Sequence, residues 1–589
     1  MKRKTSYHAF GIIKRVFVFC GCALPKLVIA FGSSLFLAGV VNGFTLVVSR
    51  KLFDNVEETA TQSGVLYTTV FSVLLYITAR FLCQLTAWLR EYCTMKLESR
   101  LDIALDEIFN EKIANLSALD FEDKTRIDSI EKATSGMNCV PVLFISIMSI
   151  LCYHLVYFFI LGVFLYQINP VLSLSLILVF IPVALTQVIQ VKYYTDEEEK
   201  LAPLRRFEDS FYYSAMDTRE TRLFGLFNHF KNLRLEAMKK VFAVQWKTQK
   251  KINSINFVLN MIKVFGWIGI LVLLYFSLKS GNITIGTFAA VFMSIGTMFS
   301  MTEELFSVYH NGITANSGAV ANFLALTMIE QKKEQVQTFN ESHGIQLSHV
   351  TFSYPTAENP AVNDVSLIIH PGESFAIVGE NGSGKTTLSK LICGLYMPDT
   401  GSVIVDGHDT RYVDKGTLFR LFSAVFQDFG EYGALTLSDN VRISDLENFA
   451  NATPYLREAE IDVTDNETFP DGQDTIMSRE FNGIDVSKGQ WQKIAMARGD
   501  YRACEYFLLD EPTASIDPLE ETRIYQKYAK TAQEKTTVFV THRMASTRFA
   551  DRIIVMDHGK IVENGTHDEL IKQDGKYAEL WEAQAEGYR

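Results

Sequence analysis

The sequence predicts a multi-domain membrane protein: an α-helical transmembrane domain of six spans with long cytosolic helical extensions, followed by an α/β P-loop domain. Three observations support this. Long apolar runs without Asp, Glu, Lys or Arg crowd into the first half of the 589 residues. After about residue 344 the pattern changes to short β-rich runs that alternate with helices, and these runs include a glycine-rich phosphate-binding loop.

The whole-chain composition excludes several other classes of protein. Hydrophobic residues make up 48% and charged residues 21%, which rules out a disordered or collagen-like chain. The net charge of -11 gives no drive toward polyanions, so nucleic acid is not an expected partner. The 8 cysteines show no paired spacing that would predict a zinc site or a disulfide framework.

The transmembrane domain is predicted over residues 27–327. A helix needs about 20 apolar residues to cross the hydrocarbon core of a bilayer, and charges at its centre are costly. Six segments meet this requirement: about 27–49, 59–84, 140–166, 171–191, 256–278 and 282–306.

Residues 1–26 are predicted to form an interfacial helix leading into the first span. The alternative, a cleaved signal peptide, is weaker because Lys14 and Arg15 interrupt the apolar run and a full-length span follows directly. Basic residues before the first span place the N-terminus in the cytoplasm, and an even number of spans places the C-terminal half there too. We therefore expect a multi-pass protein of the cell membrane.

The two inner loops are predicted to be long and helical. No Gly or Pro occurs between residues 65 and 135, so the second span is expected to continue into the cytosol as an unbroken helix. A turn near Leu119, Asp120, Phe121 and Glu122 is expected to form a short exposed helix. The second loop, about residues 192–251, repeats this plan. Such rods suit the transmission of movement, although a plain spacer is the alternative.

A polar linker is predicted over residues 328–343, and a nucleotide-binding domain over 344–589. Its first site is a buried strand, residues 374–378, that runs into a loop and then a helix. The loop has the spacing of a phosphate-binding loop and consists of Gly379, Glu380, Asn381, Gly382, Ser383, Gly384, Lys385, Thr386 and Thr387. Its backbone N–H groups and helix N-terminus favour phosphate. Lys385 would reach the β- and γ-phosphates of ATP, and the Thr386 hydroxyl would hold Mg2+.

The second site is an apolar strand, residues 506–509, that ends in Asp510 and Glu511. Two carboxylates at the end of a fully apolar strand are costly unless they have a function. We expect Asp510 to bind Mg2+ and Glu511 to polarise the attacking water as a general base. The alternative is a strand that ends at a solvated acidic turn.

At this point the sequence resembles the ATP-binding cassette transporters, specifically exporters with a fused membrane half and P-loop ATPase half. The resemblance covers nearly the whole chain and depends on several motifs in the right order. It implies that Tyr354 stacks on adenine, that Gln427 senses Mg2+, and that His542 contacts the γ-phosphate. The catalytic residues it implies are Lys385, Gln427, Glu511 and His542. The stretch Val486, Ser487, Lys488, Gly489 and Gln490 matches the signature motif, Asp517 the loop that crosses to the partner, and Glu480 the acidic position that contacts the membrane domain.

The resemblance also implies a dimer, because one chain supplies six spans and one nucleotide site where the family has twelve and two. The partner is a second half-transporter, and homodimer and heterodimer both remain open. The signature departs from the family pattern at Val486 and Lys488. We favour toleration of Lys488, whose flexible chain can point to solvent; the alternative is a weakened ATP site.

The expected function is ATP-driven export of a peptide or amphipathic small molecule by alternating access. Residues 481–493 resemble exporters of bacterial peptides and lantibiotics. A lipid flippase, a multidrug pump, an importer with the exporter fold, an ATP-gated channel and a regulatory sensor are the alternatives. Arg80, Glu303 and Glu304 are charged residues at the ends of spans, and carboxylates in the cavity would favour a cationic cargo. The favoured alternative places these three residues at the inner interface, where they brace the bundle. His154, with Tyr153 and Tyr157, is open to the same two interpretations.

Overall fold

The computed structural model describes residues 9–61, 66–168, 170, 193, 197, 200–201, 204–216, 220–327, 343–355, 357–511 and 535–586. The chain divides into two compact units, which are described separately. Unit 1 comprises Met1–Asn115 and Asp128–Ile329, and unit 2 comprises Leu116–Ile127 and Glu330–Arg589. The predicted span 171–191 and the linker up to residue 342 lie outside the described residues.

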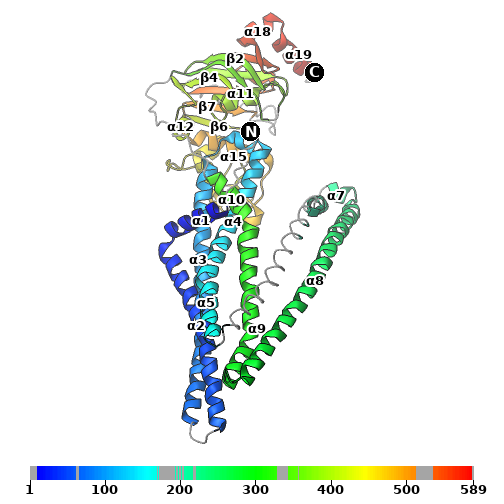
Figure 1. Cartoon of the computed structure of the whole chain (residues 1–589). Coiled ribbons are helices and arrows are strands. Elements are labelled where there is room, and N and C mark those ends of the chain that lie inside the picture. Colours follow the sequence, from blue (N-terminus) through cyan, green and yellow to red (C-terminus); the bar gives the residue numbers. More distant parts are fainter. Residues whose placement is uncertain are drawn as a thin grey trace. The chain divides into compact units, whose positions relative to one another are not determined.

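Unit 1 is entirely helical where it is described (Figure 1). Its α-helices are α1 (Ala9–Ala23), α2 (Pro25–Thr61), α3 (Leu66–Ala114), α4 (Lys124–Ser149), α5 (Leu155–Ile168), α7 (Glu220–Leu223), α8 (Phe227–Lys279), α9 (Ile285–Ser307) and α10 (Ala315–Thr327). Two π-helical segments, η2 (Ile150–His154) and η3 (Val308–Thr314), join α4 to α5 and α9 to α10.

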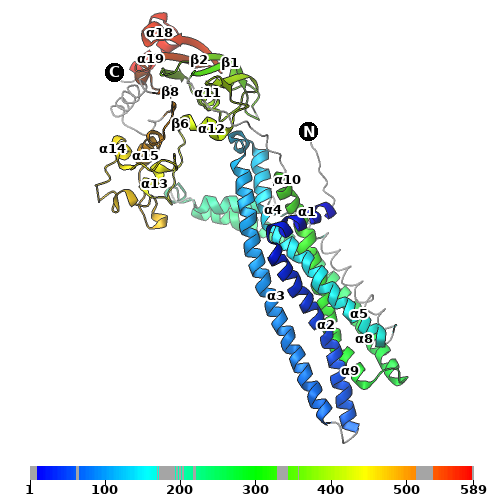
Figure 2. The same cartoon turned by 90° about the vertical axis from the view of Figure 1, so that its left-hand side faces the viewer.

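Four helical stretches of the described chain are long and apolar enough to cross a membrane. They are Pro25–Ala60, Leu66–Ala114, Lys124–Ile168 and Ile285–Thr327, and Ile268–Lys279 is a shorter apolar helix. Helix α2 packs along both α3 and α9, as Figures 1 and 2 show from two sides. Apolar side chains of α1, among them Ile12 and Val16, are buried in the same cluster as side chains of α3, α4 and α10.

Residues 50–58, which lie between the first two predicted spans, are helical and form the end of α2, which continues to Thr61. Polar residues do not end a helix when they can pair along it, and Arg50 lies 3.5 Å from Asp54 one turn later. Asp54 also accepts a hydrogen bond of 2.5 Å from Thr284, the N-cap residue of α9. The helical extension of α2 therefore fixes the start of α9.

Unit 2 contains two sheets. The antiparallel sheet has the order β2-β1-β4-β5 and the other has the order β10-β9-β3-β8-β7-β6, in which all neighbouring pairs are parallel except β10 with β9. The strands are β1 (Ile345–Phe352), β2 (Val362–Ile369), β3 (Ser374–Gly379), β4 (Thr400–Val405), β5 (His408–Asp409), β6 (Phe422–Val425), β7 (Tyr506–Asp510), β8 (Thr536–Val540), β9 (Arg552–Asp557) and β10 (Lys560–Gly565).

The α-helices of unit 2 are α11 (Lys385–Ile392), α12 (Lys415–Arg420), α13 (Leu437–Arg442), α14 (Thr453–Glu458), α15 (Lys488–Tyr501), α17 (Met544–Thr547), α18 (His567–Gln573) and α19 (Lys576–Glu586). The 3-10 helices are η1 (Ala118–Phe121), η4 (Gly472–Asp474) and η5 (Arg479–Phe481). The main core joins both sheets to α11, which follows β3 directly.

The short helix predicted near Leu119 is η1, and it belongs to unit 2 although its sequence lies between α3 and α4. It is half-buried rather than exposed, because Ala118 and Leu119 pack against the main core. After it, Glu122 accepts hydrogen bonds from the Tyr396 hydroxyl and from Lys390 of α11, the latter at 3.2 Å. These two donors, Tyr396 first, hold the pKa of Glu122 below its usual value.

The packing in unit 1 predicts different responses to a methyl group at two glycines. At Gly136 of α4 a Cβ atom would lie 2.0 Å from the Ala319 carbonyl oxygen, whereas at Gly162 of α5 nothing lies within 4 Å. We expect Gly136→Ala to lower the melting temperature of the detergent-solubilised protein, because overpacking costs about 1–3 kcal/mol. Gly162→Ala is the control and should leave it unchanged or raise it slightly. Equal melting temperatures for the two variants would contradict this packing.

Candidate functional site

The loop after β3 needs glycine at two positions. Gly379 has φ 150° and Gly384 has φ 101°. A Cβ atom would lie 2.3 Å from the Met556 carbonyl oxygen at Gly379, and 2.3 Å from the Ala361 carbonyl oxygen at Gly384. The loop between them therefore lies close to neighbouring backbone and leads directly into the N-terminus of α11, where N–H groups favour an anion.

Lys385, the first residue of α11, is buried at 5% exposure. Its ammonium donates hydrogen bonds to the carbonyl oxygens of Gly379 and Glu380, at 2.9 and 3.0 Å. Burial lowers the pKa of Lys385, and the nearby carboxylates of Glu511 and Asp510 oppose that shift. The side chain thus holds a positive charge inside the loop, next to two carboxylates.

The order of the parallel strands brings the predicted groups to one edge of the sheet. Strands β3, β8, β7 and β6 are neighbours in that order and run in the same direction. Their carboxyl ends lead to the Gly379 loop, His542, Asp510 with Glu511, and Gln427 respectively. Ligands of open α/β sheets bind outside this edge. The structure therefore collects residues from four separate motifs of the sequence.

Asp510 has 0% exposure at the end of β7. One oxygen, Oδ1, lies 3.3 Å from the Thr386 hydroxyl, and the other, Oδ2, is buried without a hydrogen-bond partner among the described residues. Burial raises the pKa of Asp510 to about 6. A buried carboxylate oxygen without a donor, beside a hydroxyl, fits the oxygen ligands that Mg2+ prefers, so the two residues predicted to hold the metal suit it.

Glu511 follows with the positive φ of 48°, which turns it away from the strand direction. Its Oε1 lies 3.1 Å from Nδ1 of His542. This bond is the main reason that the pKa of Glu511 is lowered, so the carboxylate is ionised at neutral pH. Glu511 is therefore available as a proton acceptor, with a histidine orienting it.

Tyr354 lies on the other side of the loop and helix. Its hydroxyl is 3.0 Å from the Thr387 hydroxyl, and its ring meets that of Tyr396 edge to face at 6.0 Å. The ring is half-buried, so part of it is open to a planar ligand.

The signature residues do not join this cluster within the chain. Ser487 caps α15 and shares a capping box with Gln490, and the first helical residue, Lys488, is exposed. Val486 packs against a separate core around α13 to α15. Gln427 is exposed after β6, and Asp517 lies outside the described residues.

Sequence reasoning missed two residues near the loops, both on α19. Lys576 forms an ion pair of 2.7 Å with Glu380, and Gln584 bonds to the backbone around His542. Both are far from every motif along the chain, so no spacing pattern indicated them.

A second group of polar residues lies in the membrane unit. His154 ends the π-helical segment η2 and is 1% exposed. Its Nδ1 is 3.0 Å from the Ser149 carbonyl oxygen, while Nε2 has no hydrogen-bond partner among the described residues and lies 3.9 Å from Oε1 of Glu304. The Tyr157 hydroxyl is also buried without a described partner. Arg80 is exposed on α3.

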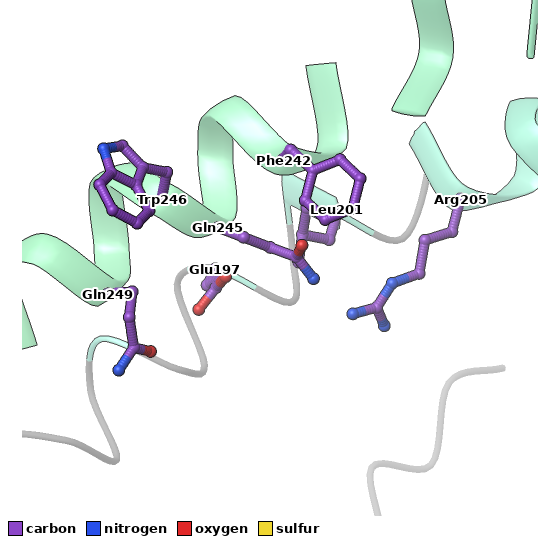
Figure 3. Close-up of a pocket in the computed structure, with 7 residues that line it drawn as sticks. All are labelled: Glu197, Leu201, Arg205, Phe242, Gln245, Trp246 and Gln249. Atoms are coloured by element: carbon purple, nitrogen blue, oxygen red, sulfur yellow. The ribbon is translucent and has the colours of Figure 1, made fainter. Parts of the chain in front are cut away.

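A cavity of about 660 Å³ lies on the polar part of α8 (Figure 3). Phe242, Gln245, Trp246 and Gln249 line it from α8, and Glu197, Leu201 and Arg205 line it from the preceding segment. It combines aromatic faces with amides and both signs of charge, which is an amphipathic lining.

The chain was compared with known proteins. The family model described as "ABC transporter" matches residues 362–514. The subtilin transport ATP-binding protein of Bacillus subtilis is 26% identical, over 95% of this chain and 93% of its own length. The nisin transport ATP-binding protein of Lactococcus lactis is 27% identical, over 86% of each.

Two further similarities extend the comparison. An ATP-dependent lipid A-core flippase of Photobacterium profundum is 31% identical over 59% of this chain and 58% of its own length. Among solved structures, a bacterial Atm1-family ABC exporter with ATP bound has a TM-score of 0.80 at 21% identity, covering 95% of this chain and 99% of that one. This shows that the chain has the exporter fold, a helical membrane domain followed by an α/β nucleotide-binding domain. Residues 362–514 thus match the ABC transporter family, and over nearly its whole length the chain is similar to bacterial transport ATP-binding proteins and has the fold of an ABC exporter.

Proposed function

We propose that this chain is one half of an exporter that hydrolyses ATP with Mg2+ and moves a cationic amphipathic peptide out of a bacterial cytoplasm. The observation that carries the ATPase part is the meeting of Lys385, Asp510, Glu511 and His542 at the carboxyl edge of one parallel sheet.

Each residue of that edge has a role in the proposal. The loop from Gly379 to Thr387 and the ammonium of Lys385 bind the β- and γ-phosphates of ATP. Asp510 and Thr386, with Gln427, hold Mg2+, which when bound neutralises phosphate charge. Glu511 accepts the proton of the attacking water, and His542 keeps its carboxylate oriented.

The remaining roles involve the base and the partner. Tyr354 stacks on adenine. The signature from Ser487 to Gln490, together with Asp517, completes the ATP site of the second half-transporter. That half is a second copy of this chain or a different one, and the mass of the purified complex distinguishes these. The exposed position of Lys488 supports toleration of the lysine. ATP binding closes the two nucleotide-binding domains, and the cargo-binding cavity between the membrane domains then opens to the outside. This requires that ATP binds the closed state more tightly than the open one.

Peptide is the favoured class of cargo. The relatives named for subtilin and nisin transport match 95% and 86% of this chain, including the membrane domain that contacts cargo. The flippase relative matches 59% of this chain. A lipid flippase is the second candidate, and the observation that favours it is the higher identity of that shorter match, 31%.

The polar group of the membrane unit supports a cationic cargo. Because the Ser149 carbonyl can only accept, Nδ1 of His154 must donate to it. In the neutral ring Nε2 is then an acceptor, and it lies 3.9 Å from the acceptor oxygen of Glu304. Two acceptors that face each other favour a cation beside them, and the Arg90 guanidinium, 4.9 Å from the centre of the Tyr153 ring, is one such cation in the chain itself. An ammonium or guanidinium group of the cargo would be a second and would further offset the carboxylate charge.

The first prediction from the proposed function concerns the base, Glu511. Glu511→Gln should lower the ATPase turnover about 10²- to 10⁴-fold, because proton transfer from water is lost, while ATP binding remains. Turnover and binding of a fluorescent ATP analogue are measured on the purified protein. The control is Glu447→Gln, which changes an exposed ion pair. Normal turnover of Glu511→Gln would reject the assignment.

The second prediction concerns Asp510 and pH. Below the pKa of about 6 its carboxylate is protonated, so Mg2+-dependent nucleotide affinity should fall as the pH drops below 6. The free energy of unfolding changes with pH in the opposite direction, falling as the pH rises. A carboxyl with a raised pKa keeps its proton when folded, so without Mg2+ wild type should lose stability from pH 4 to 7 relative to Asp510→Asn, by about 3 kcal/mol at most. Thermal melting with and without Mg2+ tests this, and parallel curves for the two proteins would contradict it.

The third prediction concerns cargo charge. Glu304→Gln should reduce export of cationic amphipathic peptides several-fold relative to neutral ones in inverted vesicles, with basal ATPase activity unchanged. Glu303→Gln is the matched control, because Glu304 is the carboxylate that lies beside His154. Equal loss for cationic and neutral peptides would remove the charge-recognition role. Loss confined to lipid flipping would favour the second candidate.

A further inference from the structure

Helix α19 packs against strands β3 and β9 and against the short helix α17 of unit 2. Tyr577 and Ala578 of this helix are buried, and Tyr577 belongs to the apolar cluster formed by β3, β9 and Met544. The Tyr577 hydroxyl is 2.6 Å from the Thr547 hydroxyl and 2.8 Å from Nδ1 of His567. The helix is thus anchored to α17 and α18, and α17 begins two residues after His542.

The N-terminus of α19 is fixed as well. The Glu563 carboxylate of β10 accepts hydrogen bonds from the backbone N–H groups of Lys576 and Tyr577, the latter at 3.0 Å. From there the Lys576 side chain reaches Glu380 of the phosphate-binding loop at 2.7 Å. An exposed ion pair of this kind contributes little to stability. It therefore shows that α19 lies beside the phosphate-binding loop, but it does not hold the helix there.

The other end of α19 reaches the histidine loop through one side chain. Gln584 accepts a hydrogen bond of 2.8 Å from the backbone N–H of Met544 and donates one to the carbonyl oxygen of His542. A single amide group therefore holds the backbone on both sides of Arg543. On its inner side the loop is held by the backbone N–H of Thr541, which donates to the Ile377 carbonyl at 3.1 Å.

We propose that Gln584 is a positioning residue for ATP hydrolysis, which acts by holding the His542 backbone so that the imidazole meets Glu511. The imidazole of His542 is 44% exposed, so its place depends strongly on its backbone. The inference rests on the proposed catalytic roles of His542 and Glu511. The inference adds that the end of helix α19 belongs to the ATPase machinery. The described hydrogen bonds of Gln584 itself go to the backbone of His542 and Met544 and not to the phosphate-binding loop or Glu511.

The expected effect is on turnover and not on ATP binding. The loss of one or two hydrogen bonds that orient the base partner should lower kcat about three- to tenfold in Gln584→Ala, with the KM for ATP and the melting temperature unchanged. Gln584→Glu keeps the acceptor for Met544 but loses the donor to His542, so it should be as slow as Gln584→Ala. The control is Glu582→Ala, an exposed change on the same helix, which should match wild type.

A double-mutant cycle with His542→Ala separates the role of Gln584 from that of His542. If Gln584 acts through the histidine, Gln584→Ala should cause no further loss in the His542→Ala background. A slow His542→Ala with a normal Gln584→Ala or Gln584→Glu would overturn the role of Gln584 alone. The role of Gln584 would also be overturned if the kcat losses of the two single variants multiplied in the double variant. A raised KM for ATP, or a lowered melting temperature that accounts for the slower turnover, would overturn it as well. A fully active His542→Ala would reject the proposed role of His542, and the role of Gln584 with it.

Discussion

The nucleotide site is organised by the burial of one carboxylate at the end of a parallel strand. Asp510 is fully buried, and its second oxygen has no donor within the described chain. An ionised carboxylate in such a place is costly unless a cation joins it, and the nearby ammonium of Lys385 is turned toward the loop carbonyls instead. In the proposed function, a metal-bound triphosphate would supply both missing partners, a cation for Asp510 and an anion for Lys385. The free energy released by such binding would be available to favour a different arrangement of the domain.

The phosphate-binding side of the site is connected by hydrogen bonds to η1. Lys385 begins α11, and Lys390 on the same helix bonds to Glu122, which follows η1. η1 belongs to unit 2, and the chain on its two sides forms α3 and α4. Tyr396 links the same carboxylate to the ring of Tyr354, so both the phosphate side and the proposed adenine side of the site connect to Glu122.

The sequence indicated those parts that follow from local pattern. Three such parts are the phosphate-binding loop, the acidic strand end and the unbroken helix from the second span. Each is continuous in the chain, so residues adjacent in the sequence determine its structure. The continuation of α2 beyond residue 49 was not predicted, because the pairing of Arg50 with Asp54, and of Asp54 with Thr284, depends on the fold. The roles of Glu122 and Gln584 were missing for the same reason. Each acts on groups 40 or more residues away, and a single glutamate or glutamine on a polar surface has no pattern of its own.

The membrane helices show how a polar group is placed in apolar surroundings. A π-helical turn loosens the regular backbone bonds, and in lipid every carbonyl left over must find a donor. In η2 the ring of His154 supplies that donor to Ser149, and in η3 the amide of Asn316 supplies it to the carbonyls of Asn311 and Gly312, at 2.6 and 3.0 Å. Glu304 lies one turn before η3, so both distortions occur close to the same pair of side chains. A side chain that bonds to a free backbone carbonyl in this way has a fixed orientation. For His154, the bond from Nδ1 to the Ser149 carbonyl leaves Nε2 facing Glu304.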